Sequence, residues 1–304
     1  MTHAAGFACL VGRPNVGKSS LTNALVGQKV AITSPRPQTT RHAVRGIVNL
    51  DDAQLILVDT PGLHKPRTLL GERLNDLVRT TWAEVDVVGL CLPADQRPGP
   101  GDRYLASEIA KLGAQRVVLI LTKMDLVDRS AGAEALAVGS AMCESVGLVP
   151  DEVVPVSVVS GENIDVLAGV LAAALPSGPA LYPEGVLTDE PEETLVAELI
   201  REAALADVRE ELPHSIAVTV DEMNPREDRP VEKPLLDVHA TIHVERESQK
   251  PIIIGKGGSR LRQIGADARG QIERLLGTPV YLSLHVRVAK EWQRDAKQLK
   301  RLGF

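Results

Sequence analysis

The sequence GRPNVGKS, residues 12–19, decides the fold of the N-terminal half of this 304-residue chain. It has the form G-x-x-x-x-G-K-[ST], whose glycines let successive backbone amides point at nucleotide phosphates. An apolar strand at 7–11 precedes it and a helical stretch at 19–27 follows it. Lys18 is therefore expected to neutralise the β- and γ-phosphates, and Ser19 to ligate Mg²⁺. We assign the whole loop to the nucleotide: Gly12, Arg13, Pro14, Asn15, Val16, Gly17, Lys18, Ser19 and Ser20.

A second motif, DTPG at 59–62, ends the apolar run at 54–58. An Asp at the end of a strand can hold Mg²⁺ through water, and the Gly62 amide can reach the γ-phosphate. These four residues, Asp59, Thr60, Pro61 and Gly62, join the candidate nucleotide site.

Two further motifs indicate the base. TKMD at 122–125 ends the apolar run at 116–121, and the Asp125 carboxylate can accept hydrogen bonds from N1–H and the N2 amine of guanine, a donor pair that adenine lacks. VSVVSG at 156–161 follows a third run and offers a backbone amide near Val158 to O6, with Ser157 beside it. Four motifs in this order, each after a strand, favour a GTPase over a P-loop kinase or an ATPase.

The pattern along the first 175 residues predicts a doubly wound α/β domain with a mainly parallel sheet. Strands are expected near 7–12, 43–50, 54–59, 85–92, 116–121 and 153–157, and helices near 18–26, 71–82, 102–112, 132–146 and 163–174. Residues 176–194 contain four prolines and read as a linker.

A second domain is expected over 195–304. It comprises a helix at 194–212, strands at 215–223 and 235–246, the sequence PIIIGKGG, a helix at 259–276, a strand at 279–288 and a basic helix at 289–302. Charge divides in the same way, because residues 245–304 carry +7 and the rest of the chain −13. A basic end on an acidic body is typical of an appended nucleic-acid-binding module.

The order α-β-β-α-α-β with G-x-x-G at 255–258 resembles the α+β fold of type II KH domains. The four motifs resemble translation-factor-class GTPases. The sequences PQTTR at 37–41, DTPGLHKP at 59–66 and IIIGKGGSRLRQIG at 252–265 are similar to those of the Era family of bacterial GTPases, and the resemblance runs from about residue 6 to about residue 302. It implies a GTPase switch that binds the 3′ end of small-subunit ribosomal RNA and assists assembly of the small ribosomal subunit.

The resemblance also implies roles for single residues. Thr39 and Thr40 lie in the first switch, where Thr40 would complete the Mg²⁺ ligands with Ser19 and Asp59. Asn15 either stabilises a turn or helps bind a K⁺ ion. Lys18, Thr40, Asp59, Gly62 and Asn15 are the residues expected to act in hydrolysis of GTP to GDP. Lys123 and Asp125 belong to the guanine motif.

The chain departs from the family pattern at two places, both in the guanine site. The guanine motif starts with Thr122 instead of Asn, and its shorter hydroxyl is expected to donate to N7 of the base. Val158 stands where Ala is usual, which leaves the backbone contact possible. Leu63 follows Gly62, where many GTPases have a Gln that orients water, so slow intrinsic hydrolysis is expected.

RNA contacts are expected at the G-x-x-G and at the basic end. Glycines let an RNA backbone approach closely, and a helix start favours phosphate. The candidate residues are Gly255, Lys256, Gly257, Gly258, Arg260, Lys290 and Arg294. The alternative for the basic end is a solvated helix face.

Two alternative functions are a tRNA-modification GTPase and a GTPase attached peripherally to the inner face of the membrane through its basic end. The longest apolar runs are too short to cross a bilayer. We expect a cytoplasmic monomer whose three scattered cysteines are small core residues.

Overall fold

The computed structural model describes residues 3–34, 39–41, 43–62, 68–113, 116–206, 212–227, 229–230 and 233–304. Its contacts divide the chain into two compact units. The first comprises residues 1–31, 40–65 and 73–189, and the second comprises residues 32–39, 66–72 and 190–304.

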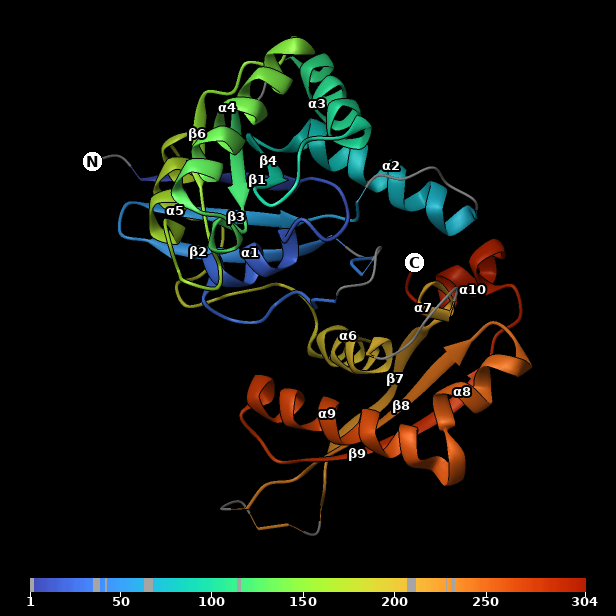
Figure 1. Ribbon diagram of the computed structural model, residues 1–304. Coiled ribbons are helices and arrows are strands. Elements are labelled where there is room, and N and C mark those ends of the chain that lie inside the picture. The colour runs from blue at the N-terminus through green and yellow to red at the C-terminus, as the bar shows by residue number, and fades with distance from the viewer. Residues whose placement is uncertain are drawn as a thin grey trace. The chain divides into compact units, whose positions relative to one another are not determined.

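The first unit is built on a six-stranded sheet in the order β2-β3-β1-β4-β5-β6 (Figure 1). Within this sheet, only β2 runs antiparallel to its neighbour, which confirms the predicted mainly parallel sheet. All residues of β3 and β4 are buried, as expected for strands covered by helices on both faces. The strands are β1 Ala4–Val11, β2 Val44–Leu50, β3 Ala53–Asp59, β4 Val87–Pro93, β5 Arg116–Thr122 and β6 Glu152–Pro155.

Helices cover both faces of this sheet (Figure 1). α1 and α5 pack on one face, and α2, α3 and α4 pack on the other. Their bounds are α1 Lys18–Val26, α2 Leu69–Glu84, α3 Pro100–Leu112, α4 Arg129–Ser145 and α5 Ile164–Ala173, with a 3₁₀ turn at Met124–Leu126. The core is mostly Val, Leu, Ile and Ala, and the three cysteines are buried and free, as predicted.

The proline-rich segment after α5 is fixed to the outer strands of the sheet. Gln54 accepts hydrogen bonds from the backbone N–H groups of Leu181 and Tyr182 at 2.7 and 2.8 Å. The Ile47 N–H donates to the Leu187 carbonyl at 2.8 Å. This segment therefore covers the edge strand β2, whose backbone groups would otherwise be open to another strand.

The second unit has a three-stranded sheet in the order β7-β8-β9, with β7 antiparallel and β9 parallel to β8. Apolar side chains of α6, α8 and α9 share one core with this sheet. The elements are α6 Glu192–Leu205, α7 Leu212–Ser215, β7 Ala217–Pro225, β8 Leu236–Val244, α8 Lys250–Ile254, α9 Ser259–Leu276, β9 Val280–Val288 and α10 Ala296–Arg301. Three-residue 3₁₀ turns lie at 247–249, 256–258 and 292–294.

The prediction of a single basic helix over 289–302 is wrong, because a 3₁₀ turn and a separate short helix take its place. Glu291 has a φ of 52°, and a 3₁₀ turn at Trp292–Arg294 follows it. Asp295 then accepts hydrogen bonds from the N–H groups of Lys297 and Gln298, so it caps a new helix, α10. Among the described residues, no helix is long and apolar enough to cross a membrane.

Trp292 anchors this end of the chain. It is fully buried, its Nε1–H donates to the Ser215 carbonyl at 3.1 Å, and its ring stacks on Phe304 with 5.4 Å between centroids.

Trp292→Ala should lower the free energy of unfolding by about 3–5 kcal/mol, because it would leave a cavity in the core. Denaturant unfolding followed by circular dichroism measures this. Ile252→Ala, at a side chain that is 49% exposed, is the control and should cost less than about half as much.

Candidate nucleotide and RNA sites

The phosphate-binding loop follows β1 and is closely packed at its first residue. A Cβ atom on Gly12 would lie 2.7 Å from Cγ2 of Val16 and 2.8 Å from the Cys91 carbonyl oxygen, so no larger residue fits. Lys18 curls back over the loop, and its Nζ donates to the carbonyls of Gly12 at 3.0 Å and Arg13 at 3.1 Å. The lysine thus holds the loop in shape where phosphate oxygens would be its partners.

Three candidate Mg²⁺ ligands come together from three elements. The hydroxyl of Ser19, on α1, donates to Oδ2 of Asp59 at the end of β3 at 2.7 Å. The Thr40 hydroxyl also donates to this oxygen, at 3.2 Å, and lies 3.1 Å from the Ser19 hydroxyl. The second carboxylate oxygen, Oδ1, is buried and has no hydrogen-bond partner among the described residues. Hard oxygen ligands around an unpaired carboxylate oxygen fit Mg²⁺.

Burial opposes both charges at this site. It raises the pKa of Asp59, while the Ser19 hydrogen bond and the Lys18 charge work in the other direction. Burial also lowers the pKa of Lys18, and the charge of Asp59 counteracts that effect. A bound metal ion and a polyphosphate would stabilise both charged forms, so the electrostatics of the site suit that ligand pair.

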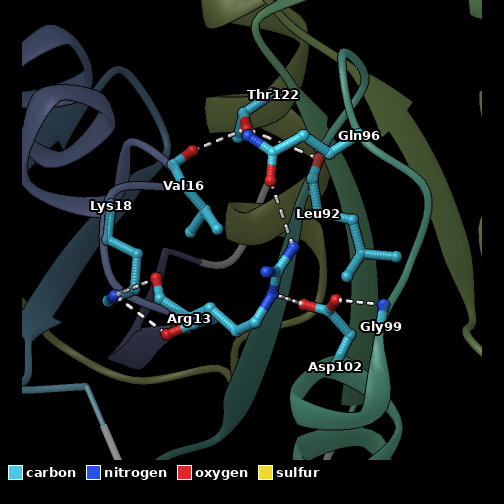
Figure 2. A network of polar contacts seen from close by, with 9 residues as sticks. Arg13, Val16, Lys18, Leu92, Gln96, Gly99, Asp102 and Thr122 are labelled. Atoms are coloured by element: carbon cyan, nitrogen blue, oxygen red, sulfur yellow. Dashed lines mark hydrogen bonds and ion pairs between the residues drawn. The ribbon is translucent and has the colours of Figure 1, made fainter.

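An ion pair that sequence reasoning missed ties the phosphate loop to α3 (Figure 2). Nε of Arg13 donates to Oδ1 of the fully buried Asp102 at 2.7 Å. The other oxygen of Asp102 accepts the Gly99 N–H at 2.7 Å, which caps the start of α3. Arg13 is therefore directed at α3. An Asp in the first turn of a helix is too common to reveal this role from sequence.

The base motifs at the ends of β5 and β6 are also joined. The Ser157 hydroxyl donates to Oδ1 of Asp125 at 2.6 Å, which orients the carboxylate. Lys123 has a φ of 60° and its Nζ lies 4.0 Å from Asp95. The Val158 side chain is 38% exposed. Thr122 is buried, and its hydroxyl donates to the Val16 carbonyl at 2.6 Å, so the predicted donation to N7 would require breaking that bond.

The switch segments are described in part. Gly62 lies beside the phosphate loop, because a Cβ atom on it would be 3.6 Å from the Pro14 ring. Thr60 and Pro61 are buried, and Asn15 has a φ of 65°. Leu63 and His64 lie outside the described residues, and so do residues 35–38 of the first switch.

Within the second unit, α6 binds the backbone on both sides of residues 35–38. The Glu202 carboxylate accepts hydrogen bonds from the Thr33 N–H at 2.8 Å and from the Thr33 hydroxyl at 3.1 Å. Arg201, buried to 1% exposure, donates to the Thr39 carbonyl and pairs with Glu198. No sequence signal indicated these contacts, because both residues fit an ordinary amphipathic helix.

The G-x-x-G forms a tight turn between α8 and α9. Gly255, Gly257 and Gly258 have φ values of 72°, 58° and 77°, which favour glycine. A Cβ on Gly255 would lie 2.7 Å from Cβ of Arg260, whereas one on Gly257 would meet nothing within 4 Å. The Arg260 guanidinium donates to the Ala206 carbonyl at 2.7 Å. The open side of the turn is therefore at Gly257.

The two candidate RNA-binding residues of the basic end, Lys290 and Arg294, differ in their surroundings. Arg294 pairs with Glu291 at 3.3 Å, and both side chains are well exposed. Lys290 is exposed just after β9. Phosphate binding by these two residues stays a prediction.

Fold and site together define a P-loop GTPase with an appended KH domain. A family model described as "50S ribosome-binding GTPase" matches residues 7–123, and one described as "KH domain" matches residues 211–293. The chain belongs to the Era family of GTPases. It is 67% identical to the GTPase Era of Streptomyces coelicolor over 302 residues, which are 99% of this chain and 95% of that protein. Identity to the GTPase Era of Mycobacterium tuberculosis is 63%, over 99% and 98% of the two chains.

Two solved structures are similar over the whole chain. Era in complex with MgGDPNP and nucleotides 1506–1542 of 16S ribosomal RNA matches with a TM-score of 0.92, 36% identity and 99% coverage of both chains. A single-residue variant of Aquifex aeolicus Era bound to GDP·AlF₄⁻ matches with the same values. The family expected from the sequence is thus confirmed.

The ion pair between Arg13 and Asp102 yields a prediction for nucleotide binding. Asp102→Asn keeps an acceptor for Gly99 but removes the charge facing Arg13. The variant should lose about 1–3 kcal/mol of unfolding free energy and bind GDP several-fold more weakly, because the phosphate loop loses a support. Thermal unfolding and titration with fluorescent GDP measure the two effects.

Arg97→Ala is the matched control, since Arg97, on the loop before α3, pairs with Glu134 of α4 and the two side chains are 85% and 60% exposed. An exposed pair contributes at most about 1 kcal/mol. Unchanged GDP affinity in Asp102→Asn, together with lower stability, would show that the ion pair serves the fold alone.

Proposed function

We propose that the protein hydrolyses GTP to GDP and phosphate, and that it binds the 3′-terminal region of 16S ribosomal RNA to assist assembly of the small ribosomal subunit. The main support is the full-length likeness to Era carrying MgGDPNP and nucleotides 1506–1542 of that RNA. The 67% identity to the GTPase Era of Streptomyces coelicolor extends over both units of this chain.

The nucleotide chemistry rests on residues that the structure brings together. Lys18 would exchange the Gly12 and Arg13 carbonyls for the β- and γ-phosphates. Ser19, Thr40 and Asp59 would hold Mg²⁺, Asp59 through water, in place of their mutual hydrogen bonds. Mg²⁺ held by these residues would supply positive charge to the phosphate oxygens. The Gly62 amide, in a residue that lies next to Pro14 of the phosphate loop, is the proposed contact to the γ-phosphate.

The base would be read by Asp125, which Ser157 holds in position. Its carboxylate can accept from N1–H and N2–H₂ of guanine, and adenine offers no such pair. The Val158 backbone amide is the proposed contact to O6. A K⁺ ion beside Asn15 remains a proposal, with a turn-stabilising role for Asn15 as the alternative.

RNA would bind at the turn between α8 and α9. The glycines leave room for the RNA backbone, and Lys256 and Arg260 supply positive charge. We also propose that the protein is a monomer and that it lies in the cytoplasm, where its proposed partner, ribosomal RNA, is found. A tRNA-modification role is one alternative, and it does not account for the KH domain. Weak peripheral attachment to the membrane through the basic end is the other alternative.

Lys18→Ala tests the hydrolase. The variant should lose at least about a hundredfold in GTP hydrolysis, because Arg13, the other cation of the loop, is directed at Asp102 and not at the phosphates. Phosphate release measures the rate, and circular dichroism checks the fold, since two backbone carbonyls lose their donor. Hydrolysis at the wild-type rate would contradict the assignment of the phosphate loop.

Gly257→Asp tests the RNA site. The position is open and Asp tolerates positive φ better than most residues, so the fold should survive. Binding to an RNA of the 16S 3′-terminal sequence should weaken at least about tenfold, because a carboxylate would face phosphates. Filter binding at several salt concentrations measures this, and GTP affinity should stay unchanged.

Gly257→Asn is the matched control, because it has the shape of Asp without the charge. It should bind the RNA more tightly than Gly257→Asp. Wild-type RNA affinity in both variants would mean that the G-x-x-G is only a helix start.

A further inference from the structure

Thr122 occupies the first position of the guanine motif, and its hydroxyl is directed at the phosphate loop. Oγ1 donates to the Val16 carbonyl at 2.6 Å and lies 3.4 Å from the Leu92 carbonyl. Figure 2 shows Thr122 between these two residues. All three residues are at most 3% exposed. The contact joins the end of β5 to the loop that precedes α1.

A hydroxyl has one hydrogen to donate. Among the described residues, the two hydrogen-bond partners of Oγ1 are carbonyl oxygens, which only accept, and the Val16 carbonyl is the nearer of the two. Turning the hydroxyl toward a bound base would leave the buried Val16 carbonyl without this donor, an unfavourable exchange. The donor is therefore committed to the protein.

Purine N7 is an acceptor and can receive a hydrogen bond from a donor in its binding site. An Asn side chain has two amide hydrogens, so at this position it could serve Val16 and N7 together. Thr serves one of them. The neighbouring specificity group is different in kind, because Asp125 presents acceptors to the N1 and N2 edge and is oriented by Ser157 at 2.6 Å.

We propose that Thr122 ties the guanine motif to the phosphate loop and provides no donor to N7. The nucleotide site should therefore accept guanine nucleotides whose N7 is replaced by carbon. This inference rests on the proposed function, since it takes guanine to be the base read by Asp125.

The test compares GDP with 7-deaza-GDP, which lacks the N7 acceptor and keeps the N1, N2 and O6 groups. Competition against fluorescent GDP gives both dissociation constants. For the wild-type protein we expect the two to agree within about twofold, since a lost hydrogen bond to a neutral group would cost about five- to tenfold. Discrimination of about fivefold or more against 7-deaza-GDP, the cost of one such hydrogen bond, would overturn the inference.

Two variants make the test independent of a single substitution. Thr122→Asn adds a second donor, so it should bind GDP more tightly than 7-deaza-GDP by about five- to tenfold. Thr122→Val has nearly the same shape and no hydroxyl, so it should weaken both ligands by the same factor. A loss in Thr122→Val that is confined to GDP would show that the hydroxyl does read N7, and would overturn the inference.

Asp125→Asn separates this inference from the proposed function. That variant should exchange GDP for xanthosine diphosphate, because an amide presents a donor where the carboxylate presents an acceptor. Unchanged GDP binding in Asp125→Asn would overturn the proposed base recognition. If Asp125→Asn exchanges GDP for xanthosine diphosphate as expected, but the wild-type protein binds 7-deaza-GDP much more weakly than GDP, only the Thr122 inference would be overturned.

Discussion

The phosphate loop is a stretch of irregular backbone whose polar groups need partners, and three other elements supply them. Thr122 at the end of β5 donates to the Val16 carbonyl, and Asp102 on α3 pairs with Arg13. Asp59 at the end of β3 accepts from Ser19. Buried backbone and charged groups are costly without such partners. The strand order fixes these meetings, because β1 lies between β3 and β4, and the carboxyl ends of parallel strands meet at one edge.

The same site holds charges that the folded protein alone satisfies only in part. Burial lowers the pKa of Lys18 and raises that of Asp59, and Oδ1 of Asp59 has no hydrogen-bond partner in the part of the chain that the structure describes. A site with these properties gains more from a nucleotide and a cation than a fully satisfied one would, since both ligands meet groups already removed from water. In this interpretation, the hydrogen bonds from Lys18 to the Gly12 and Arg13 carbonyls take the place of hydrogen bonds to phosphate oxygens.

Sequence alone predicted the strands and helices of the first unit to within a few residues, because apolar runs, glycine stops and phosphate-loop spacing are all local signals. It also placed Ser19, Thr40 and Asp59 in one site, with Thr40 added through the family resemblance. It missed the partners of Arg13, Asp125 and Thr122. Each of those contacts joins residues at least 30 positions apart through a side chain whose direction depends on the packed structure. The basic end was predicted as one helix, whereas the positive φ of Glu291 and the Asp295 cap divide the segment into a 3₁₀ turn and a short helix.

Thr122 and Asp125 have different proposed roles, support of the phosphate loop and recognition of the base. This difference explains how a guanine site can function without a donor to N7. Adenine and guanine both present N7 as an acceptor, so a contact there adds affinity without separating the two bases. They differ at the N1 and N2 edge, where guanine donates twice. The group suited to that edge is the carboxylate held by Ser157. On the proposal that Asp125 reads the base, a threonine that stabilises the phosphate loop would cost the site some affinity and would leave the selection of guanine over adenine to Asp125.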